Sequence, residues 1–364
     1  MAASFFPSRT MGLYMARMFL IRTFAVLFAL VLVLQTLDLL GESGKILAVP
    51  GNTGADVWTY VGLRVPQLIA RFLPFAILLG TLITLLTLNQ NSEIISMKAS
   101  GLSAHQVLAP LVLASLFVAI ASFSFNDRIV SRATATLDRW QKVEYGPLPS
   151  DRQAKLSVWV RDGDNLIHAG QVTGRGTGTR LKDVTVYNRT GGSLHAIVKA
   201  PLAVPDGGGW RVEGAKRFDV ASGTSSDLGT IRTGAGIRPD QFTLATVDAD
   251  GLSFRALWVA IEDLKAAGRP TGALEAGLWH KISGPLSALL MPLLGAVAGF
   301  GVARSGRLFV RAVVGMALGF AYFVADNFGL AMGNLGAYPP IVAAWGPFAL
   351  FFLIGEFVLI KTEE

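Results

Sequence analysis

The sequence predicts an α-helical membrane protein with six transmembrane helices, three before and three after an inserted all-β domain of the jellyroll type. Three observations carry this prediction: few charged residues, six long apolar runs, and a central stretch that alternates between apolar and polar residues. The charged fraction is 16% over 364 residues, whereas soluble domains carry about 25%. A charge at the centre of a membrane helix costs about 2.5–3.5 kcal/mol, so this deficit indicates that lipid solvates much of the chain.

Six apolar runs are long enough to cross a bilayer, which takes about 20 residues. They cover Met15–Leu39, Gln67–Leu88, Val107–Phe125, Leu278–Val302, Leu308–Leu330 and Pro340–Ile360. The first run is too long for the core of a signal peptide, and no small-residue cleavage site follows it. We therefore expect it to remain in the protein as the first span.

The stretch between the third and fourth runs has a different composition, rich in Gly, Asp, Arg and Thr. Period-two alternation, as in Leu156–Val160, and turn clusters such as Asp162–Asn165 are typical of half-buried antiparallel strands. A short amphipathic helix is expected at Phe254–Ala267, with Leu257, Val259, Ile261 and Leu264 on its apolar side. These patterns predict three regions: residues 1–144 with three spans, a β-sandwich or jellyroll-like domain over 145–252, and residues 253–364 with that helix and three further spans.

Basic residues in the loops predict the orientation, because Lys and Arg concentrate on the cytoplasmic side of membrane proteins. One side carries Arg9, Arg17, Arg22, Arg304, Arg307, Arg311 and Lys361. The opposite loops are poor in basic residues: 41–62 contains only Lys45, and 331–339 contains none. We therefore expect both termini in the cytoplasm and the β-domain in the periplasm of a bacterium with two membranes. The net charge of +7 then fits an anionic membrane surface and requires no nucleic acid.

The short cytoplasmic loop at 89–105 is the first candidate functional segment. Ser92 is placed to cap a helix whose first turn contains Glu93, and Gly101 is placed to end it. A short helix between two spans is a surface that a membrane subunit can offer to a soluble motor. The alternative is a helix that only connects two spans, and the residues alone leave both open. The residues assigned to the motor contact are Ser92, Glu93, Met97, Lys98 and Gly101.

Cations near the outer leaflet form a second candidate site, for lipid phosphate. Arg128, Arg132 and Arg139 are spaced by four and seven, which places them on one face of a regular helix. A planar guanidinium binds phosphate through two hydrogen bonds. Lys281 opens the fourth apolar run on the same side of the membrane and joins the set. The alternative for each is an anchor at the interface or an ion pair.

Acidic residues inside the apolar runs are the third group. Asp38, Asp326 and Glu356 are candidates because intramembrane acids are costly and are usually functional. All three lie near a predicted interface, so a hydrated or paired structural role is the favoured alternative.

The chain has no cysteine, and its histidines show no metal-ligand spacing. We predict no metal, no cofactor and no catalytic residues, so any ATP hydrolysis requires another chain.

Four runs resemble the YjgP/YjgQ family of permeases, the LptF and LptG subunits of the lipopolysaccharide exporter. They are Ser92–Ser103, Val158–Asn165, Leu278–Leu286 and Phe323–Gly329. The second and third of these runs are more similar to LptG than to LptF. The resemblance extends over nearly the whole chain and implies six spans with a periplasmic β-jellyroll.

The same resemblance implies a set of partners in the bacterial inner membrane. They are an LptF-like second permease subunit, an LptB-like ATPase dimer, an LptC-like single-span protein and an LptA-like periplasmic bridge, with lipopolysaccharide as the cargo. The Ser92–Ser103 loop would be the coupling helix, with Glu93 as its charged contact to the ATPase. Family members on the LptG side often carry lysines at the outer end of span one that meet lipid phosphates, whereas this chain has Gln35, Gly41 and Glu42 there. The resemblance therefore leaves Lys45, Arg128, Arg132 or Lys281 to take the place of those lysines.

Two other classes of function compete with lipid export. A six-span anchor could present the β-domain for sensing or envelope assembly, in which case no ATPase would bind. A different ATP-driven permease, for lipoprotein release or efflux, fits less well because such permeases commonly have other span counts around the outer domain. A membrane enzyme is disfavoured because the sequence shows no catalytic constellation.

Overall fold

The computed structural model describes residues 8–148, 154–174, 176–190, 192–234, 237–244, 248–266, 268–299 and 308–361. The contacts divide the chain into two compact units. Unit 1 comprises Met1–Leu47, Asn52–Ala135 and Ala249–Glu364, and its described elements are helices. Unit 2 comprises Ala48–Gly51 and Thr136–Asp248 and contains a β-sheet.

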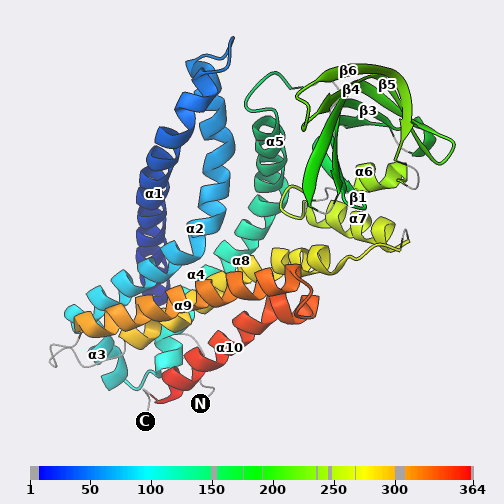
Figure 1. The fold of residues 1–364 in the computed structure, drawn as a ribbon. Helices are drawn as coiled ribbons and strands as arrows, with labels where there is room; N and C mark the ends of the chain where they lie inside the picture. The colour runs from blue at the N-terminus through cyan, green and yellow to red at the C-terminus, as the bar shows by residue number, and fades with distance from the viewer. Residues whose placement is uncertain are drawn as a thin grey trace. The chain divides into compact units, whose positions relative to one another are not determined.

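Long apolar helices make up most of unit 1 (Figure 1). In chain order the helices are α1 (Arg9–Leu47), α2 (Gly54–Gln90), α3 (Glu93–Ala99), α4 (Ala104–Phe125), the π-helix η1 (Asn126–Val130), α5 (Ser131–Lys142), α7 (Phe254–Ala266), α8 (Gly272–Gly299), α9 (Leu308–Asn334) and α10 (Pro340–Lys361), with α5 continuing from unit 1 into unit 2. Within the described residues, five helices are long and apolar enough to cross a membrane, in α1, α2, α4 with its continuation, α9 and α10. The fourth predicted run extends to Val302, outside the described residues, so the count of six spans stays a prediction.

Two capping boxes fix where helices of unit 1 begin. Thr53 caps α2 together with Asp56, and Ser103 caps α4 together with Gln106. Helix α2 therefore starts well before the predicted run at Gln67. Hydropathy detects only the part of a helix that lipid can surround, whereas capping determines where its hydrogen bonds begin.

Small residues allow the helices of unit 1 to pack closely. Helices α1 and α2 run side by side (Figure 1), and a Cβ added at Gly80 of α2 would collide with Thr23 of α1. Similar collisions would occur between Gly319 and Leu78 and between Gly355 and Leu293. Close approach at small residues is the usual basis of helix association in membranes, where water provides no hydrophobic driving force. Helix α8 is central to the unit, because it contacts α2, α4, α9 and α10.

Unit 2 is built on a six-stranded antiparallel sheet whose strands follow one another in sequence order (Figure 1). The strands are β1 (Lys155–Asp162), β2 (Asn165–Thr173), β3 (Arg180–Thr190), β4 (Ser193–Asp206), β5 (Gly209–Asp219) and β6 (Ser225–Thr233). This result confirms the predicted inserted β-domain. The sequential order is a simpler connectivity than the two Greek keys of a full jellyroll.

The sheet alternates as its sequence predicts. In β1, Val158 and Val160 are buried whereas Trp159 between them is half exposed. The predicted turn clusters are hairpin turns, since Asp162 pairs with Asn165 and Asp206 pairs with Gly209. Alternation therefore identifies the buried face of the sheet correctly.

Helix α7 forms where the amphipathic pattern places it. Its buried residues are Leu257, Ile261 and Leu264, at helical spacing. The assignment of Val259 to the apolar side is wrong, because Val259 is 52% exposed. It lies two residues from both Leu257 and Ile261 and therefore points to another side of the helix.

Candidate functional site

Helix α3 is the short helix predicted in the 89–105 loop, and its start differs from the prediction. Ser92 occupies the N-cap position, but its backbone is left-handed (φ 57°) and its side chain makes no capping hydrogen bond. A side-chain cap requires the extended backbone that Thr53 and Ser103 adopt. The predicted capping role of Ser92 is therefore wrong, although the helix itself is present.

The end of α3 is formed by Gly101, as predicted. Gly101 has φ 88°, a conformation that few residues other than glycine adopt at low cost. The Gly101 N–H donates to the Lys98 carbonyl (3.0 Å) and the Leu102 N–H donates to the Met97 carbonyl (3.2 Å). This pair of hydrogen bonds is a Schellman motif, which fixes both the length and the exit direction of the helix.

One side of α3 is anchored in the helical core of unit 1. Ile94 and Met97 are 3% and 4% exposed and belong to the same apolar cluster as residues of α1, α2 and α4. The other side is open: Ser92, Ile95, Ser96 and Ala99 are exposed, at the spacing of one helix face. One side of helix α3 is therefore packed against the core, and the other side is exposed.

Glu93 connects α3 to α1. The Tyr14 hydroxyl donates to Glu93 Oε1 (3.4 Å), and Asn91 Nδ2 donates to the same oxygen (3.3 Å). Glu93 remains partly exposed, and Lys98 of the same helix is also partly exposed. Helix α3 therefore contacts α1 through Glu93 and the core through Ile94 and Met97.

The three intramembrane acids each bind a partner on another helix. Asp38 of α1 accepts hydrogen bonds from Tyr60 and Arg64 of α2, with Arg64 Nη2 at 3.0 Å. Asp326 of α9 lies 3.0 Å from His280 of α8. Glu356 of α10 lies 3.2 Å from His105 of α4. This arrangement corresponds to the favoured alternative from the sequence, a paired structural role.

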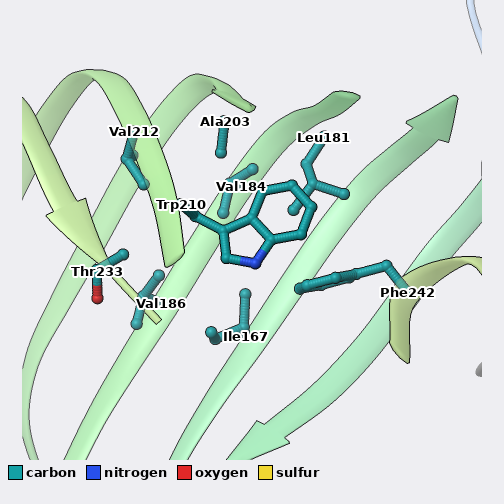
Figure 2. A pocket seen from close by; sticks show the side chains of 9 residues that line it. All are labelled: Ile167, Leu181, Val184, Val186, Ala203, Trp210, Val212, Thr233 and Phe242. Atoms are coloured by element: carbon teal, nitrogen blue, oxygen red, sulfur yellow. The ribbon is translucent and has the colours of Figure 1, made fainter. Parts of the chain in front are cut away.

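Aromatic side chains fill the interior of the sheet in unit 2. Figure 2 shows the indole of Trp210 and the ring of Phe242 among the side chains of the inner face of the sheet. Phe242 comes from α6 (Pro239–Leu244), is fully buried, and meets Trp210 edge to face at 5.1 Å between ring centroids. Trp210 Nε1 donates to the Ile237 carbonyl at 3.0 Å. The inward-facing apolar residues therefore pack against the chain's own helix.

A family model for the lipopolysaccharide export system permease LptF/LptG matches residues 13–361. The match includes the helices of unit 1, helix α3 and the whole sheet.

The chain belongs to the LptF/LptG family.

Curated LptF/LptG relatives agree with this assignment. The lipopolysaccharide export system permease protein LptG of Escherichia coli (strain K12) is 29% identical over 321 residues, which cover 85% of this chain and 86% of the relative. The LptG protein of Haemophilus influenzae is 25% identical over 328 residues, covering 86% of this chain and 89% of the relative. The resemblance inferred from four short runs is confirmed, and lipid export is favoured over an anchor for sensing or assembly.

The cations predicted to bind lipid phosphate lie on several elements of this LptF/LptG member. Lys45 is largely exposed and pairs with Glu42 at 2.8 Å. Arg128 and Arg132 are exposed residues of unit 1, Arg139 belongs to unit 2, and Lys281 is a partly exposed residue of α8. Arg128 lies within the π-helix η1, whose wider turn changes the angular spacing. The spacing argument for one shared arginine face therefore does not apply across Arg128.

Sequence reasoning missed several residues that organise unit 1. Arg64, Tyr60 and His105 are the partners of the intramembrane acids. Asp127 accepts a hydrogen bond from the Phe254 N–H at the start of α7. Arg64 could have been noted as a charge just before an apolar run, but its partner is set by helix packing.

Among the described residues, no group of three potential metal ligands occurs.

Proposed function

We propose that this chain is the LptG-type permease subunit of an ATP-driven exporter, which extracts lipopolysaccharide from the inner membrane and passes it to a periplasmic bridge. The observation that carries this proposal is the family match over residues 13–361, which includes both the helical unit and the sheet. Each CH₂ of an acyl chain costs about 0.8 kcal/mol of free energy when it moves from lipid into water. A lipid with several acyl chains therefore requires an energy source and a sheltered path.

Helix α3 is the proposed contact with the ATPase. Its buried side, Ile94 and Met97, holds it against the core, and its exposed face is available to a soluble partner. Glu93 contributes a negative charge beside that face and a hydrogen bond to Tyr14 of α1. Closure of an LptB-like ATPase dimer would push α3, and the motion would pass to α1, α2 and α4.

The proposed topology places α3 in the cytoplasm of a bacterium and the sheet in the periplasm. Its basis is the concentration of arginines at the N-terminus and after the fourth span, compared with the basic-poor opposite loops. Both termini are then cytoplasmic, in a multi-pass protein of the inner membrane. Helix α3 and the sheet would then act on opposite sides of the membrane.

The proposed partners supply the parts of the exporter that this chain does not form. An LptF-like subunit would close a lipid cavity with this chain, and an LptC-like protein would add a single span beside the pair. Large apolar side chains of α1, among them Phe28 (70% exposed) and Leu40 (76% exposed), are available to lipid or to such helices. An LptA-like bridge would receive the lipid from the periplasmic side.

Lipid phosphate would meet cations that several elements contribute. Arg128 and Arg132 are the strongest candidates because both are exposed. Lys45 is also exposed and pairs with Glu42, and Arg139 and Lys281 would contribute from other parts of the chain. A surface ion pair is worth about 0–1 kcal/mol, so the pairing of Lys45 hinders phosphate binding only slightly.

Co-purification tests the proposed function. The tagged full-length chain is extracted in mild detergent from its own host, and the proteins and lipids that accompany it are identified by mass spectrometry. We expect a second permease subunit, a soluble ATPase and bound lipopolysaccharide. Isolation of the chain alone, free of ATPase and lipid, would favour the membrane anchor instead.

A further inference from the structure

One row of side chains crosses the outer face of the sheet in unit 2. From β1 to β5 the members of this outer row are Trp159, His168, Thr185, Lys199 and Lys216, each the Cα partner of the next. The chain neighbours of the first four members are all buried in the apolar cluster of the inner face. Alternation along the strands therefore turns the outer row away from that cluster.

The β1 end of the outer row is an aromatic surface. The indole of Trp159 contacts the His168 ring at 4.6 Å between ring centroids and lies nearly parallel to the Tyr187 ring at 5.7 Å, with 19° between the planes. The Ser157 hydroxyl lies 3.1 Å from His168 Nε2 and holds the imidazole beside the indole. Trp159 is nevertheless 50% exposed. A flat apolar surface, held in place by its neighbours, is therefore open to solvent.

The other end of the outer row carries two lysines in an unfavourable arrangement. Lys199 and Lys216 lie directly opposite one another on β4 and β5, and both are exposed. Like charges directly opposite each other destabilise a strand pair. Among the described residues neither lysine forms an ion pair, and Asp227, the partner of Lys216 on β6, accepts a hydrogen bond from the Gly229 N–H at 2.9 Å. An anionic group held between the two lysines would remove the repulsion.

The separation of the two ends defines the ligand. Trp159 and Lys199 lie three strands apart, about 14 Å, with Thr185 on the strand next to Lys199. A ligand that reaches both has an apolar face at one end, hydroxyl groups along its length and a negative charge at the other end. An acidic oligosaccharide has all three, because the C–H groups on one face of a sugar ring pack against an aromatic ring and its carboxylate or phosphate substituents bind lysine. An apolar partner helix would instead bury both lysines without compensation.

We propose that the outer row binds an acidic oligosaccharide, with a sugar ring stacked on Trp159 and an anionic substituent between Lys199 and Lys216. The inference rests on the proposed function and deepens it, since the oligosaccharide would be the sugar part of the exported lipopolysaccharide. The outer row would contact the cargo through its sugars and make no contact with the acyl chains, so a lipid-free oligosaccharide is sufficient for binding.

The test measures binding of a lipid-free oligosaccharide to the full-length chain with its co-purified subunits in lipid nanodiscs. The probe is the acidic oligosaccharide that mild acid releases from the host's lipopolysaccharide, and saturation-transfer NMR gives its affinity and the sugar protons that touch the protein. We expect Trp159→Ala to weaken binding by about tenfold, the effect of one aromatic contact, and Trp159→Phe to weaken it less. Trp258→Ala is the matched control, because Trp258 of α7 is 52% exposed but lies in unit 1. It should leave the affinity unchanged.

Lysine variants test the charged end separately. Lys199→Gln and Lys216→Gln should each weaken binding by about threefold and make it less sensitive to salt, because each removes one exposed charge from the contact. Lys142→Gln, at an exposed position of α5, is the matched control and should change neither quantity. Reduction of the carboxylates and removal of the phosphates from the oligosaccharide should abolish the difference between the wild type and the lysine variants. These measurements decide the question even if Trp159→Ala does not fold.

Any of three results would overturn the inference. They are a wild-type complex that carries lipopolysaccharide but does not bind the oligosaccharide, equal effects of Lys199→Gln and Lys142→Gln, and a Trp159→Ala variant that binds the oligosaccharide normally, including one that loses a protein subunit instead. A complex that contains neither lipopolysaccharide nor an ATPase would contradict the proposed function itself, and the inference with it.

Discussion

Single acidic side chains in unit 1 form pairs that link one helix to another. Asp38, Asp326 and Glu356 would each be costly in an apolar bundle, and each has a partner on another helix. The sequence identifies the acids because a charge in an apolar run is conspicuous. It does not identify the partners, which lie 22 to 251 residues away along the chain.

Glu93 is the residue whose change should separate assembly from coupling. In Glu93→Ala, Ile94 and Met97 still anchor α3, so we expect normal membrane insertion. We expect reduced ATPase association or lipid-dependent ATP hydrolysis that no longer drives export. Co-purification and an export assay measure these effects. Tyr14→Phe is the control, because it removes only the hydrogen bond to α1 and should cause a smaller defect. Normal export by Glu93→Ala would exclude Glu93 from the mechanism.

His168 should make the stability of the sheet depend on pH. Burial lowers the pKa of His168 below its usual value of 6.5, and its ring lies between Ser157 and Trp159. Because the unfolded chain binds a proton more readily, this contribution to stability is present above about pH 6.5 and is lost as the pH falls through the lowered folded value.

The measurement is the melting temperature of unit 2, followed by tryptophan fluorescence between about pH 5 and 8. We expect it to fall toward acid pH in the wild type and to change less in His168→Gln. His195→Gln, at an exposed position of β4, is the matched control. An identical pH profile in wild type and His168→Gln would contradict the assignment.

At the scale of elements, helix positions follow from sequence patterns, whereas their irregularities follow from packing. Apolar runs locate α1, α2 and α4, and Gly101 locates the end of α3. The π-helix η1 and the left-handed Ser92 have no comparable sequence signal. Neither feature is encoded by a local pattern of apolar and polar residues.

The contact between α1 and α2 should fail when Gly80 gains a side chain. A Cβ at Gly80 would collide with Thr23, whereas a Cβ at Gly62 of the same helix meets nothing within 4 Å. We expect Gly80→Val to lower the free energy of unfolding by about 1–3 kcal/mol, the usual cost of overpacking. Gly62→Val should change it by less than about 0.5 kcal/mol. Thermal melting in detergent measures both, and equal stability of the two variants would show that the helices separate there without cost.

At the scale of the whole molecule, the proposed mechanism requires α3 and the sheet to lie on opposite sides of the membrane. The absence of cysteine makes labelling clean, since one introduced thiol is the only thiol. Ser96→Cys of α3 and Ser193→Cys of β4 are both exposed positions. We expect a membrane-impermeant maleimide to label Ser193→Cys in spheroplasts and to label Ser96→Cys only after the inner membrane is opened. Labelling of both in the same compartment would end the proposed mechanism.

The sequence by itself determined that the chain is a membrane protein with an inserted antiparallel β-domain and a short helix after the second span. It could do so because transfer of side chains into lipid, strand alternation and turn chemistry are local properties. The tertiary structure alone decided which residues meet: Asp38 with Arg64, Tyr14 with Glu93, and Phe242 with Trp210 inside the sheet. Those contacts join distant parts of the chain and depend on helix register and strand curvature, which no single segment encodes.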